Sequence, residues 1–335
     1  MDNSNYRKTL YNKPFIEQRA DPYVYRHSDG TYYFTASVPE YDRIILRSAG
    51  TIAGLGTAQE IAVWYKHESG EQSIHIWAPE IHYLDGEWYI YYAAGDKDDI
   101  WEIRPYVLRC KGQNPSTPSS LATSYYPWEE MGMMQAADDD EFSFHDFSLD
   151  ATVFENRGER YYIWAEKTGV GKKVSNLYIA RMESPVKLGT AQVLLTTPDY
   201  DWERVDFWVN EGPAVLKHDG KIFLTFSASA TGVCYCMGLM YIDENADVLD
   251  PRAWTKLRYP VLRTDSEKGI YGPGHNSFVK AGDGVTDLCI YHARQYDEIV
   301  GDPLYDPNRH AMVMKLDYDD KGFPVFSYDN NIEMY

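Results

Sequence analysis

The chain has 335 residues, of which 44% are hydrophobic and 25% are charged, so it can bury a sizeable core and is not generally disordered. Its formal net charge of −19 disfavours nucleic acid and anionic membrane surfaces as partners, because no cluster of Lys and Arg offsets that charge locally. No stretch approaches the roughly 20 consecutive apolar residues that a membrane-spanning helix needs. These observations predict a folded protein that binds neither nucleic acid nor membranes.

The first residues and the cysteines give an expectation about the compartment. Residues 1–19 carry six charged side chains and no apolar segment, so no secretory signal peptide is visible. The four cysteines, Cys110, Cys234, Cys236 and Cys289, are too sparse for a disulfide framework and lack the second Cys/His pair of a zinc site. We expect reduced, structural thiols, which are typical of a cytoplasmic protein.

One phrase recurs five times along the chain: a polar anchor, a short apolar strand, a turn that contains Gly, and a second, aromatic strand. The five copies begin at Asp21, Glu80, Asp150, Glu211 and His275, and successive anchors are 59, 70, 61 and 64 residues apart. Gly supplies the positive φ that a tight hairpin turn requires, so each unit is predicted to open with a hairpin.

Taken in chain order, the predicted hairpins span residues 21–37, 80–94, 150–165, 211–227 and 275–292. The segment between Trp101 and Ser148 fits the repeat least, since it holds four prolines and an acidic run, and we expect surface loops there. Units of this length hold four strands, and no amphipathic helix pattern interrupts them. The sequence therefore predicts an all-β fold, a five-bladed β-propeller with four-stranded antiparallel blades that forms a single domain over residues 1–335.

Radial repetition of this kind has a chemical consequence. Equivalent positions on the inner strands converge on the central channel, so we expect the five anchors to face one another near one mouth. The chain also has 29 Tyr, 9 Trp and 12 Phe, whose flat rings suit the C–H faces of a sugar although most of them pack sheets.

The residues around the anchors resemble glycoside hydrolase family 43. The matching motifs occur in the family's order over essentially the whole chain, at Ala20–Tyr23, Trp77–Glu80, Leu149–Ala151, Asn210–Pro213 and Gly272–Asn276. This resemblance implies a five-bladed propeller that hydrolyses arabinose- or xylose-containing glycans with inversion at the anomeric carbon.

Carried over motif by motif, the resemblance implies that Asp21 is the general base, that Asp150 tunes and orients the acid, and that Glu211 is the general acid. A carboxylate beside Glu211 would keep it protonated by like-charge repulsion. His275 matches the family's axial histidine, which implies a calcium or sodium ion, hydrated, on the propeller axis. Glu80 is expected to support the inner ring and not to be catalytic.

Four further residues are candidates for sugar binding. Trp77 either forms the floor of the sugar pocket or packs beneath it. His145 and Phe147 either line the pocket or pack in the core or within a loop. Arg294, in the stretch Tyr-His-Ala-Arg, resembles an arginine that reaches the active site in arabinose-acting members, with a surface salt bridge as the alternative. His292 is interpreted as a structural strand histidine.

Within the family, the motifs look most like exo-acting α-L-arabinofuranosidases, which implies an arabinose-containing oligo- or polysaccharide as the partner. β-Xylosidase and endo-1,5-α-L-arabinanase are the alternatives. The chain ends near the fifth blade without the β-sandwich of many family xylosidases, which favours arabinose. A non-catalytic sugar-binding propeller would share the aromatic platforms but has no reason to place three acids at successive inner strands.

Overall fold

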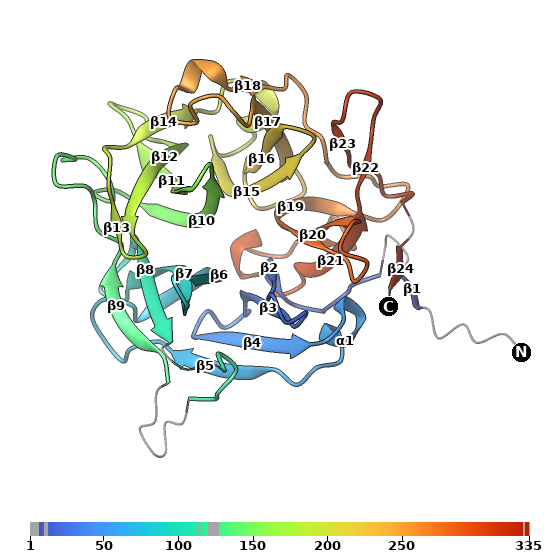
Figure 1. The fold of residues 1–335 in the computed structure, drawn as a ribbon, viewed down its shortest axis with the longest axis horizontal. Coiled ribbons are helices and arrows are strands. Elements are labelled where there is room, and N and C mark those ends of the chain that lie inside the picture. The colour runs from blue at the N-terminus through green and yellow to red at the C-terminus, as the bar shows by residue number, and fades with distance from the viewer. Residues whose placement is uncertain are drawn as a thin grey trace, which may run out of the picture.

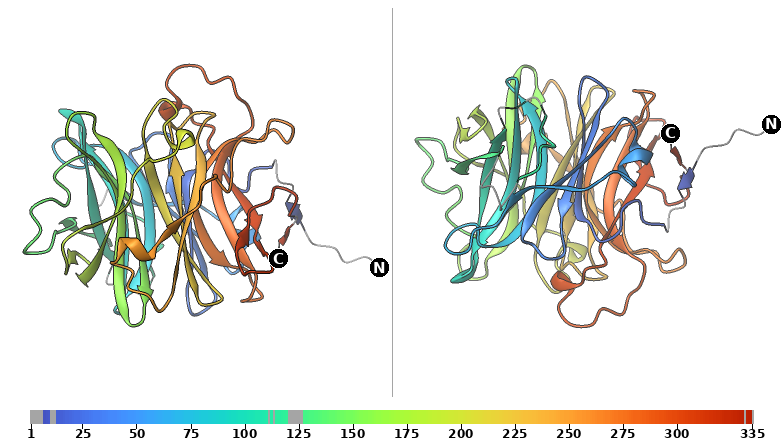
Figure 2. Two further views of the ribbon diagram at one scale, coloured as in Figure 1. Left: turned by 90° about the horizontal axis from the view of Figure 1, so that it is seen from above. Right: turned by 90° about the horizontal axis from the view of Figure 1, so that it is seen from below.

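The computed structural model describes residues 7–9, 13–110, 112, 114–119, 127–330 and 332–334. Nearly all regular structure in this part of the chain is β-strand, and five antiparallel sheets stand around a common axis like blades (Figure 1). Side views show the strands running along that axis from one face of the molecule to the other (Figure 2). The predicted all-β, five-bladed propeller is confirmed.

Within each blade the strands follow chain order from the axis outward. Blade one holds β2 (Ala20–Arg26), β3 (Tyr32–Ser37), β4 (Arg43–Ala49) and β5 (Ile61–Tyr65). Blade two holds β6 (Ile74–Leu84), β7 (Glu87–Asp96), β8 (Asp99–Cys110) and β9 (Glu129–Met133). Blade three holds β10 (Ser148–Asn156), β11 (Glu159–Thr168), β12 (Val174–Ser184) and, both paired with β12, β13 (Lys187–Leu188) and β14 (Val193–Thr196).

Blade four holds β15 (Asn210–His218), β16 (Lys221–Ala228), β17 (Cys236–Asp243) and β18 (Thr255–Lys256), and blade five holds β19 (Tyr271–Lys280), β20 (Asp287–Arg294) and β21 (His310–Lys315). The remaining elements are short: β1 (Arg7–Thr9), β22 (Asp317–Tyr318), β23 (Pro324–Val325), β24 (Ile332–Met334), helix α1 (Ile52–Leu55) and the 3-10 turns η1 (Asp201–Glu203), η2 (Pro251–Ala253) and η3 (Pro303–Tyr305). None of the helices in the described ranges has the length and apolar character needed to cross a membrane.

The predicted hairpins open the blades, and their turns explain why Gly recurs. In Asp85-Gly86, Arg157-Gly158 and Asp219-Gly220 both central residues have positive φ, and each pair directly joins the first two strands of a blade. Two-residue turns of this kind match the right-handed twist of the strands, and Gly adopts their conformation without steric cost.

The first and fifth blades are joined by a short stretch of chain that precedes β2. The backbone N–H groups of Phe15 and Ile16 both donate to the carbonyl of Ala311 on β21, at 2.7 and 3.2 Å, and Ala311 N–H donates back to Ile16 at 2.9 Å. Beyond this contact, β1 pairs antiparallel with β24. Residues from the two ends of the chain therefore hold the ring closed beside blade five, whose sheet has three strands in the described residues.

The expectation of loops between Trp101 and Ser148 is wrong in part. The third and fourth strands of blade two, β8 and β9, occupy parts of that segment. Pro105 does not prevent this pairing: it lies opposite Ala93 in the sheet, and its carbonyl accepts a hydrogen bond from Met134 N–H at 2.9 Å. A proline is tolerated in a strand where no donor is required of it.

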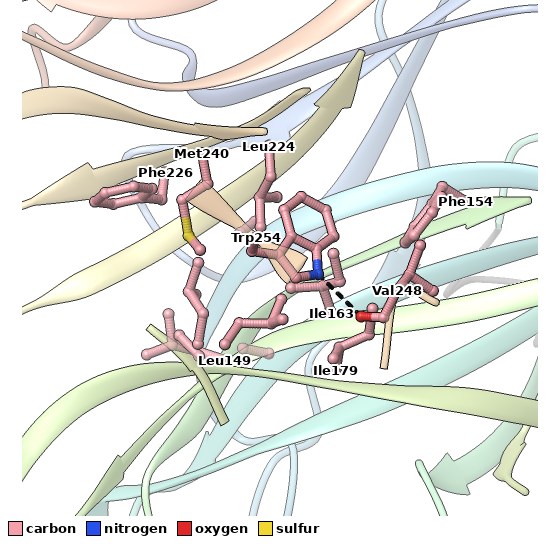
Figure 3. Close-up of a cluster of buried hydrophobic side chains, with 14 of the residues drawn as sticks. Leu149, Phe154, Ile163, Ile179, Leu224, Phe226, Met240, Val248 and Trp254 are labelled. Atoms are coloured by element: carbon pink, nitrogen blue, oxygen red, sulfur yellow. Dashed lines mark hydrogen bonds between the residues drawn. The ribbon is translucent and has the colours of Figure 1, made fainter. Parts of the chain in front are cut away.

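The core lies between neighbouring blades and reaches the channel. In the cluster between blades three and four, Ile163 and Ile179 from one sheet face Leu224 and Met240 from the other (Figure 3). Each such fully buried side chain stabilises the fold by about 1.5–3 kcal/mol. Leu149 belongs to the same cluster, so packing fixes β10 immediately before Asp150.

Candidate active site

A pocket of about 260 Å³ opens where the inner strands begin. Three of the carboxylates that line it come from the inner strands of three different blades: Asp21 of β2, Asp150 of β10 and Glu211 of β15. His275 of β19 and Arg309, which directly precedes β21, complete the charged and polar lining near them. The inner strands thus bring the predicted carboxylates and His275 together at one mouth of the channel.

A β-bulge at the start of every inner strand presents these side chains. The pairing register shifts at the bulge, and a residue there has positive φ in each strand: Asp21 (52°), Ala78 (45°), Asp150 (54°), Gly212 (53°) and His275 (44°). Strands β6 and β19 contain a second register shift, with positive φ at His75 (55°) and Gly272 (57°). Only Gly adopts this conformation freely, and other residues pay about 1–3 kcal/mol for it. Bulges re-aim side chains and are common beside active sites.

Two of the five predicted anchors do not themselves occupy the positive-φ position of the bulge. Glu211 precedes its bulge residue by one position, and Glu80 follows Ala78 by two. Glu80 does not line the pocket, so the expectation that all five anchors meet at the mouth is wrong for it. Its buried carboxylate lies 3.0 Å from His82 Nε2, and burial raises the pKa of Glu80 despite that contact.

Asp21 has a dense set of polar and cationic neighbours. Its Oδ2 accepts a hydrogen bond from Ser37 Oγ at 2.6 Å. Its Oδ1 lies 3.3 Å from His275 Nδ1, 3.3 Å from His292 Nδ1 and 3.6 Å from Arg309 Nη1. The backbone N–H of Asp21 also donates to His292 Nδ1 at 3.1 Å. The carboxylate is therefore held at both oxygens.

These neighbours set the charge of Asp21. Burial alone raises the pKa of Asp21, but His275, Arg309 and His292 together outweigh it and hold the pKa well below its usual range. Burial lowers the pKa of both histidines, that of His292 to about 3, so both rings are neutral at neutral pH. Arg309 is then the permanent positive charge beside Asp21, which stays ionised.

Asp150 and Glu211 have the opposite surroundings. Asp150 Oδ2 accepts a hydrogen bond from Gly212 N–H at 3.0 Å, and Tyr235 Oη donates to Glu211 Oε1 at 2.9 Å. Burial raises the pKa of Glu211 to about 7, and burial followed by the charge of Glu211 raises the pKa of Asp150 well above its usual value. Among the described ion pairs, neither carboxylate has a Lys or Arg partner. The pair therefore retains a proton near neutral pH.

The sugar-binding candidates divide into two groups. Trp77 and Phe147 line the pocket, and the Trp77 indole stacks on His75 with ring centroids 4.3 Å apart. His145 does not line the pocket: its side chain is exposed, and its backbone carbonyl accepts a hydrogen bond from Arg104 at 2.9 Å. The stretch that contains His145 and Phe147 therefore turns only Phe147 toward the cavity.

Arg294 lies behind the pocket wall and not on it. It is 1% exposed, so it forms neither a pocket contact nor a surface salt bridge. Its guanidinium donates to the carbonyls of Thr231 at 2.8 Å and Pro303 at 2.7 Å, and lies 3.5 Å from Asp306. These contacts tie together two loops that reach the pocket.

Several pocket residues were missed by the sequence reasoning: Arg309, Tyr235, Trp101 and Phe207. The positions of three of them in the sequence could have revealed them. The first and third strands of an antiparallel blade begin at the same face of the propeller, so residues near the start of a third strand also reach the pocket. Arg309 and Tyr235 directly precede the third strands β21 and β17, and Trp101 lies near the start of the third strand β8. His292 was interpreted as structural, yet it contacts Asp21 directly.

The expected axial cation was tested against the side chains present. The described residues contain no group of three or more His, Cys, Asp or Glu side chains that could hold a metal ion. His275 Nδ1 is directed toward Asp21 at 3.3 Å and Asp150 at 3.7 Å. This donor set does not form a cage of direct ligands, and the hydrated ion that the resemblance implies stays a prediction.

The fold and the pocket together define a β-propeller with a carboxylate-lined pocket at one mouth of its channel, and comparison with known proteins identifies its family. The family profile described as "Glycosyl hydrolases family 43" matches residues 11–324. The chain therefore belongs to glycosyl hydrolases family 43.

Relatives carry more specific names. Proteins named "Extracellular exo-alpha-(1->5)-L-arabinofuranosidase" from Streptomyces avermitilis and Streptomyces chartreusis are each 46% identical to this chain, over 316 and 297 residues. These matches cover 94% and 89% of this chain, but 63% and 86% of the respective relatives. The crystal structure of an α-L-arabinofuranosidase from Lactobacillus brevis matches with a TM-score of 0.87 at 47% identity, covering 94% of this chain and 95% of that one.

The expected cytoplasmic setting is contradicted by these comparisons. The two Streptomyces relatives are named extracellular enzymes, which points to secretion. The thiols do not argue otherwise, because Cys110, Cys236 and Cys289 are buried in the fold. Burial raises the pKa of Cys236 to about 12, and a thiol kept protonated in this way is inert in an oxidising compartment.

Proposed function

We propose that this chain is an exo-acting α-L-arabinofuranosidase that releases single L-arabinose units from α-1,5-linked arabino-oligosaccharides with inversion at the anomeric carbon. The observation that carries the proposal is the contrast within one pocket between Asp21, held ionised, and the Asp150–Glu211 pair, which retains a proton. The names of the relatives and of the L. brevis structure supply the sugar.

The proposed chemistry follows from those charge states. Asp21 takes a proton from a water molecule as the water oxygen attacks the anomeric carbon. Glu211 gives its proton to the glycosidic oxygen as the bond from that oxygen to the anomeric carbon breaks. The two events on opposite faces of the sugar invert the anomeric centre.

Asp150 supports the acid in two ways. It shares a proton with Glu211, because each carboxylate disfavours ionisation of the other, so that Glu211 can hold this proton until it acts. Its hydrogen bond from Gly212 N–H fixes the backbone immediately after Glu211. Tyr235 holds Glu211 Oε1 from the other side, so the acid is positioned before substrate binds.

An exo mode is supported by a wall on the blade-five side of the pocket. Asp302 and Leu304, in the loop between β20 and β21, line this wall. The Leu304 carbonyl accepts a hydrogen bond from Tyr41 at 2.5 Å, and Tyr305 Oη lies 3.1 Å from His75 Nε2. The loop is therefore fastened to blades one and two, where it closes one end of the cavity.

A direct test compares nitrophenyl α-L-arabinofuranoside with nitrophenyl β-D-xyloside, followed by NMR of the products from α-1,5-arabinotriose. The proposal expects preference for the arabinofuranoside, release of monomer, and a first-formed arabinose inverted at C1. Preference for the xyloside would identify a β-xylosidase. Internal cleavage of dyed arabinan with little monomer would identify an endo-arabinanase, and a retained anomer would overturn the assigned roles.

The axial cation is a separate proposal. His275, close to two carboxylates, would contact a hydrated calcium or sodium ion, which would supply positive charge near the inner ring. Treatment with a chelator is then expected to lower thermal stability or activity, and calcium to restore it. No change in either property after complete removal of divalent metal would contradict a calcium site.

A further inference from the structure

The guanidinium beside the base has a single hydrogen-bond partner among the described residues. Arg309 is 5% exposed, and its Nη2 donates to Tyr41 Oη at 2.6 Å. Its Nη1 lies 3.6 Å from Asp21 Oδ1, and its Nε is buried without a partner in the described part of the chain. The carboxylate attracts the guanidinium, but a contact of 3.6 Å is too long for a hydrogen bond that would orient it. The orientation of Arg309 therefore depends on Tyr41.

Tyr41 shares one hydroxyl between this guanidinium and the pocket wall. Its Oη also donates to the carbonyl of Leu304, in the loop between β20 and β21, at 2.5 Å. A guanidinium only donates and a carbonyl only accepts, so the single phenolic proton points to Leu304 and an oxygen lone pair accepts from Arg309. Burial keeps that proton in place, because it raises the pKa of Tyr41. One arrangement of the hydrogen atoms therefore satisfies all three groups.

The turn that carries Tyr41 holds its ring in this position. Tyr41 lies between β3 and β4 with a φ of 50°, a left-handed conformation that persists in a non-glycine residue only where the surroundings enforce it. Its N–H donates to the Val38 carbonyl at 3.0 Å, and its carbonyl accepts from Ile76 N–H of β6 at 3.2 Å. Its ring meets the Trp77 indole edge-on, with centroids 5.7 Å apart. Blades one and two thus place the hydroxyl before substrate binds.

The pocket wall has fastenings that do not involve this hydroxyl. The Pro303 carbonyl accepts a hydrogen bond from Arg294 at 2.7 Å, and Tyr305 Oη lies 3.1 Å from His75 Nε2. Without the Tyr41 hydroxyl the wall would keep both contacts, whereas Arg309 would keep no hydrogen bond within the described residues. Loss of the hydroxyl is therefore expected to disturb the guanidinium more than the cavity.

We propose that Tyr41 is a positioning residue, whose hydroxyl orients the Arg309 guanidinium toward Asp21 and ties that orientation to the wall at Leu304. The assignment rests on the proposed function, in which the charge of Arg309 stabilises the carboxylate that takes a proton from water. A charge oriented in advance needs no reorganisation during the reaction. Tyr41 does not line the catalytic pocket, so it acts through Arg309 and not on the sugar.

The test is a double-mutant cycle of Tyr41→Phe with Arg309→Met, with Tyr91→Phe as a matched control. Tyr91 is 0% exposed, its hydroxyl donates to the Pro185 carbonyl at 2.7 Å, and it does not line the pocket. We would measure kcat and KM on nitrophenyl α-L-arabinofuranoside and nitrophenyl β-D-xyloside, and Tm for every protein. A residue that acts through another gives losses that are not additive with those of its partner.

The proposal expects Tyr41→Phe to lose about ten-fold in kcat while KM stays within about two-fold, and Tyr91→Phe to keep both. In the Arg309→Met background the same change should cost less than about two-fold in kcat, because the group that Tyr41 orients is gone. The Tm of Tyr41→Phe and of Tyr91→Phe should fall by similar amounts, since each variant leaves a buried carbonyl without its donor.

Unchanged kcat in Tyr41→Phe would overturn the positioning role and leave the proposed function standing. A loss that persists in the Arg309→Met background, that is confined to KM, or that comes with a far larger fall in Tm than the control shows, would assign the hydroxyl to the wall or to the fold and contradict the proposal. A wild type that prefers the xyloside would overturn the proposed sugar alone, and the same cycle on the xyloside would decide the role of Tyr41. A wild type inactive on both glycosides would overturn the proposed function and this role together.

Discussion

Two corners of the same pocket hold the same kind of side chain in different protonation states. At the junction of blades one and five, Asp21 faces two histidines and Arg309. At the junction of blades three and four, Asp150 and Glu211 face each other, with a tyrosine hydroxyl and a backbone N–H as their hydrogen-bond donors. Burial penalises charge in both places, so the difference between them comes from the neighbours.

This comparison shows how one fold separates a base from an acid. At one corner His275, Arg309 and His292 together outweigh the cost of burying a carboxylate, whereas at the other corner burial prevails and raises the pKa of Glu211 to about 7. A circular arrangement makes this separation easy, because each blade brings its own set of neighbours to the common mouth.

Replacement of the base is expected to give the largest effect. Asp21→Asn keeps the shape but cannot accept a proton from water, so kcat should fall by about 10² to 10⁴-fold. The loss should be similar for an activated aryl arabinofuranoside and for α-1,5-arabinotriose, because both need the same attacking water. Steady-state kinetics on the two substrates checks this, and near-normal turnover in the variant would remove Asp21 from the mechanism.

Replacement of the acid should separate the same two substrates. Glu211→Gln lacks the transferable proton, so arabinotriose, with its poor leaving group, should again lose about 10² to 10⁴-fold. A nitrophenol departs with little protonation and should be partly spared. The ratio of the two kcat/KM values is the measurement, and equal losses on both substrates would contradict an acid role for Glu211.

A smaller effect is expected when the cation beside the base is removed. Arg309→Met takes away the permanent charge 3.6 Å from Asp21, so the pKa of that carboxyl should rise toward the value that burial favours. Asp21 acts while ionised, and the acidic limb of the kcat/KM profile should move to higher pH. Arg309→Lys keeps a charge and should shift the limb less. Identical profiles for both variants would show that the charge of Arg309 does not set this pKa.

Much of the fold could be predicted from short-range pattern. Asp85-Gly86 and Asp219-Gly220 mark two-residue turns because positive φ at both positions is costly for most other residue pairs. The aromatic strands that follow such turns have to pair with the strands before them, and five repeats of that unit determine the propeller. The part of the ring that escaped prediction, the bonding of Phe15 and Ile16 to Ala311, joins residues nearly 300 positions apart.

In the pocket, too, residues in local motifs could be predicted and long-range contacts could not. Asp21, Asp150 and Glu211 could be found because each belongs to a local motif at the start of an inner strand. Their partners escaped this motif search, since Arg309 belongs to no such motif and reaches Asp21 only when the ring closes. The pattern Tyr-His-Ala-Arg drew attention to Arg294, whereas the arginine that lines the pocket follows it by fifteen residues.

The most direct test of the contrast between the two corners is the pH dependence of kcat/KM on phenyl α-L-arabinofuranoside for wild type and Glu211→Gln. The acid acts only while protonated, so wild-type activity should fall as the pH rises through about 7, the pKa to which burial raises Glu211. In the variant the neutral side chain cannot titrate, and that alkaline limb should disappear while the remaining activity stays level. An alkaline limb that persists unchanged in Glu211→Gln would show that another group titrates there and would contradict the assignment of Glu211 as the acid.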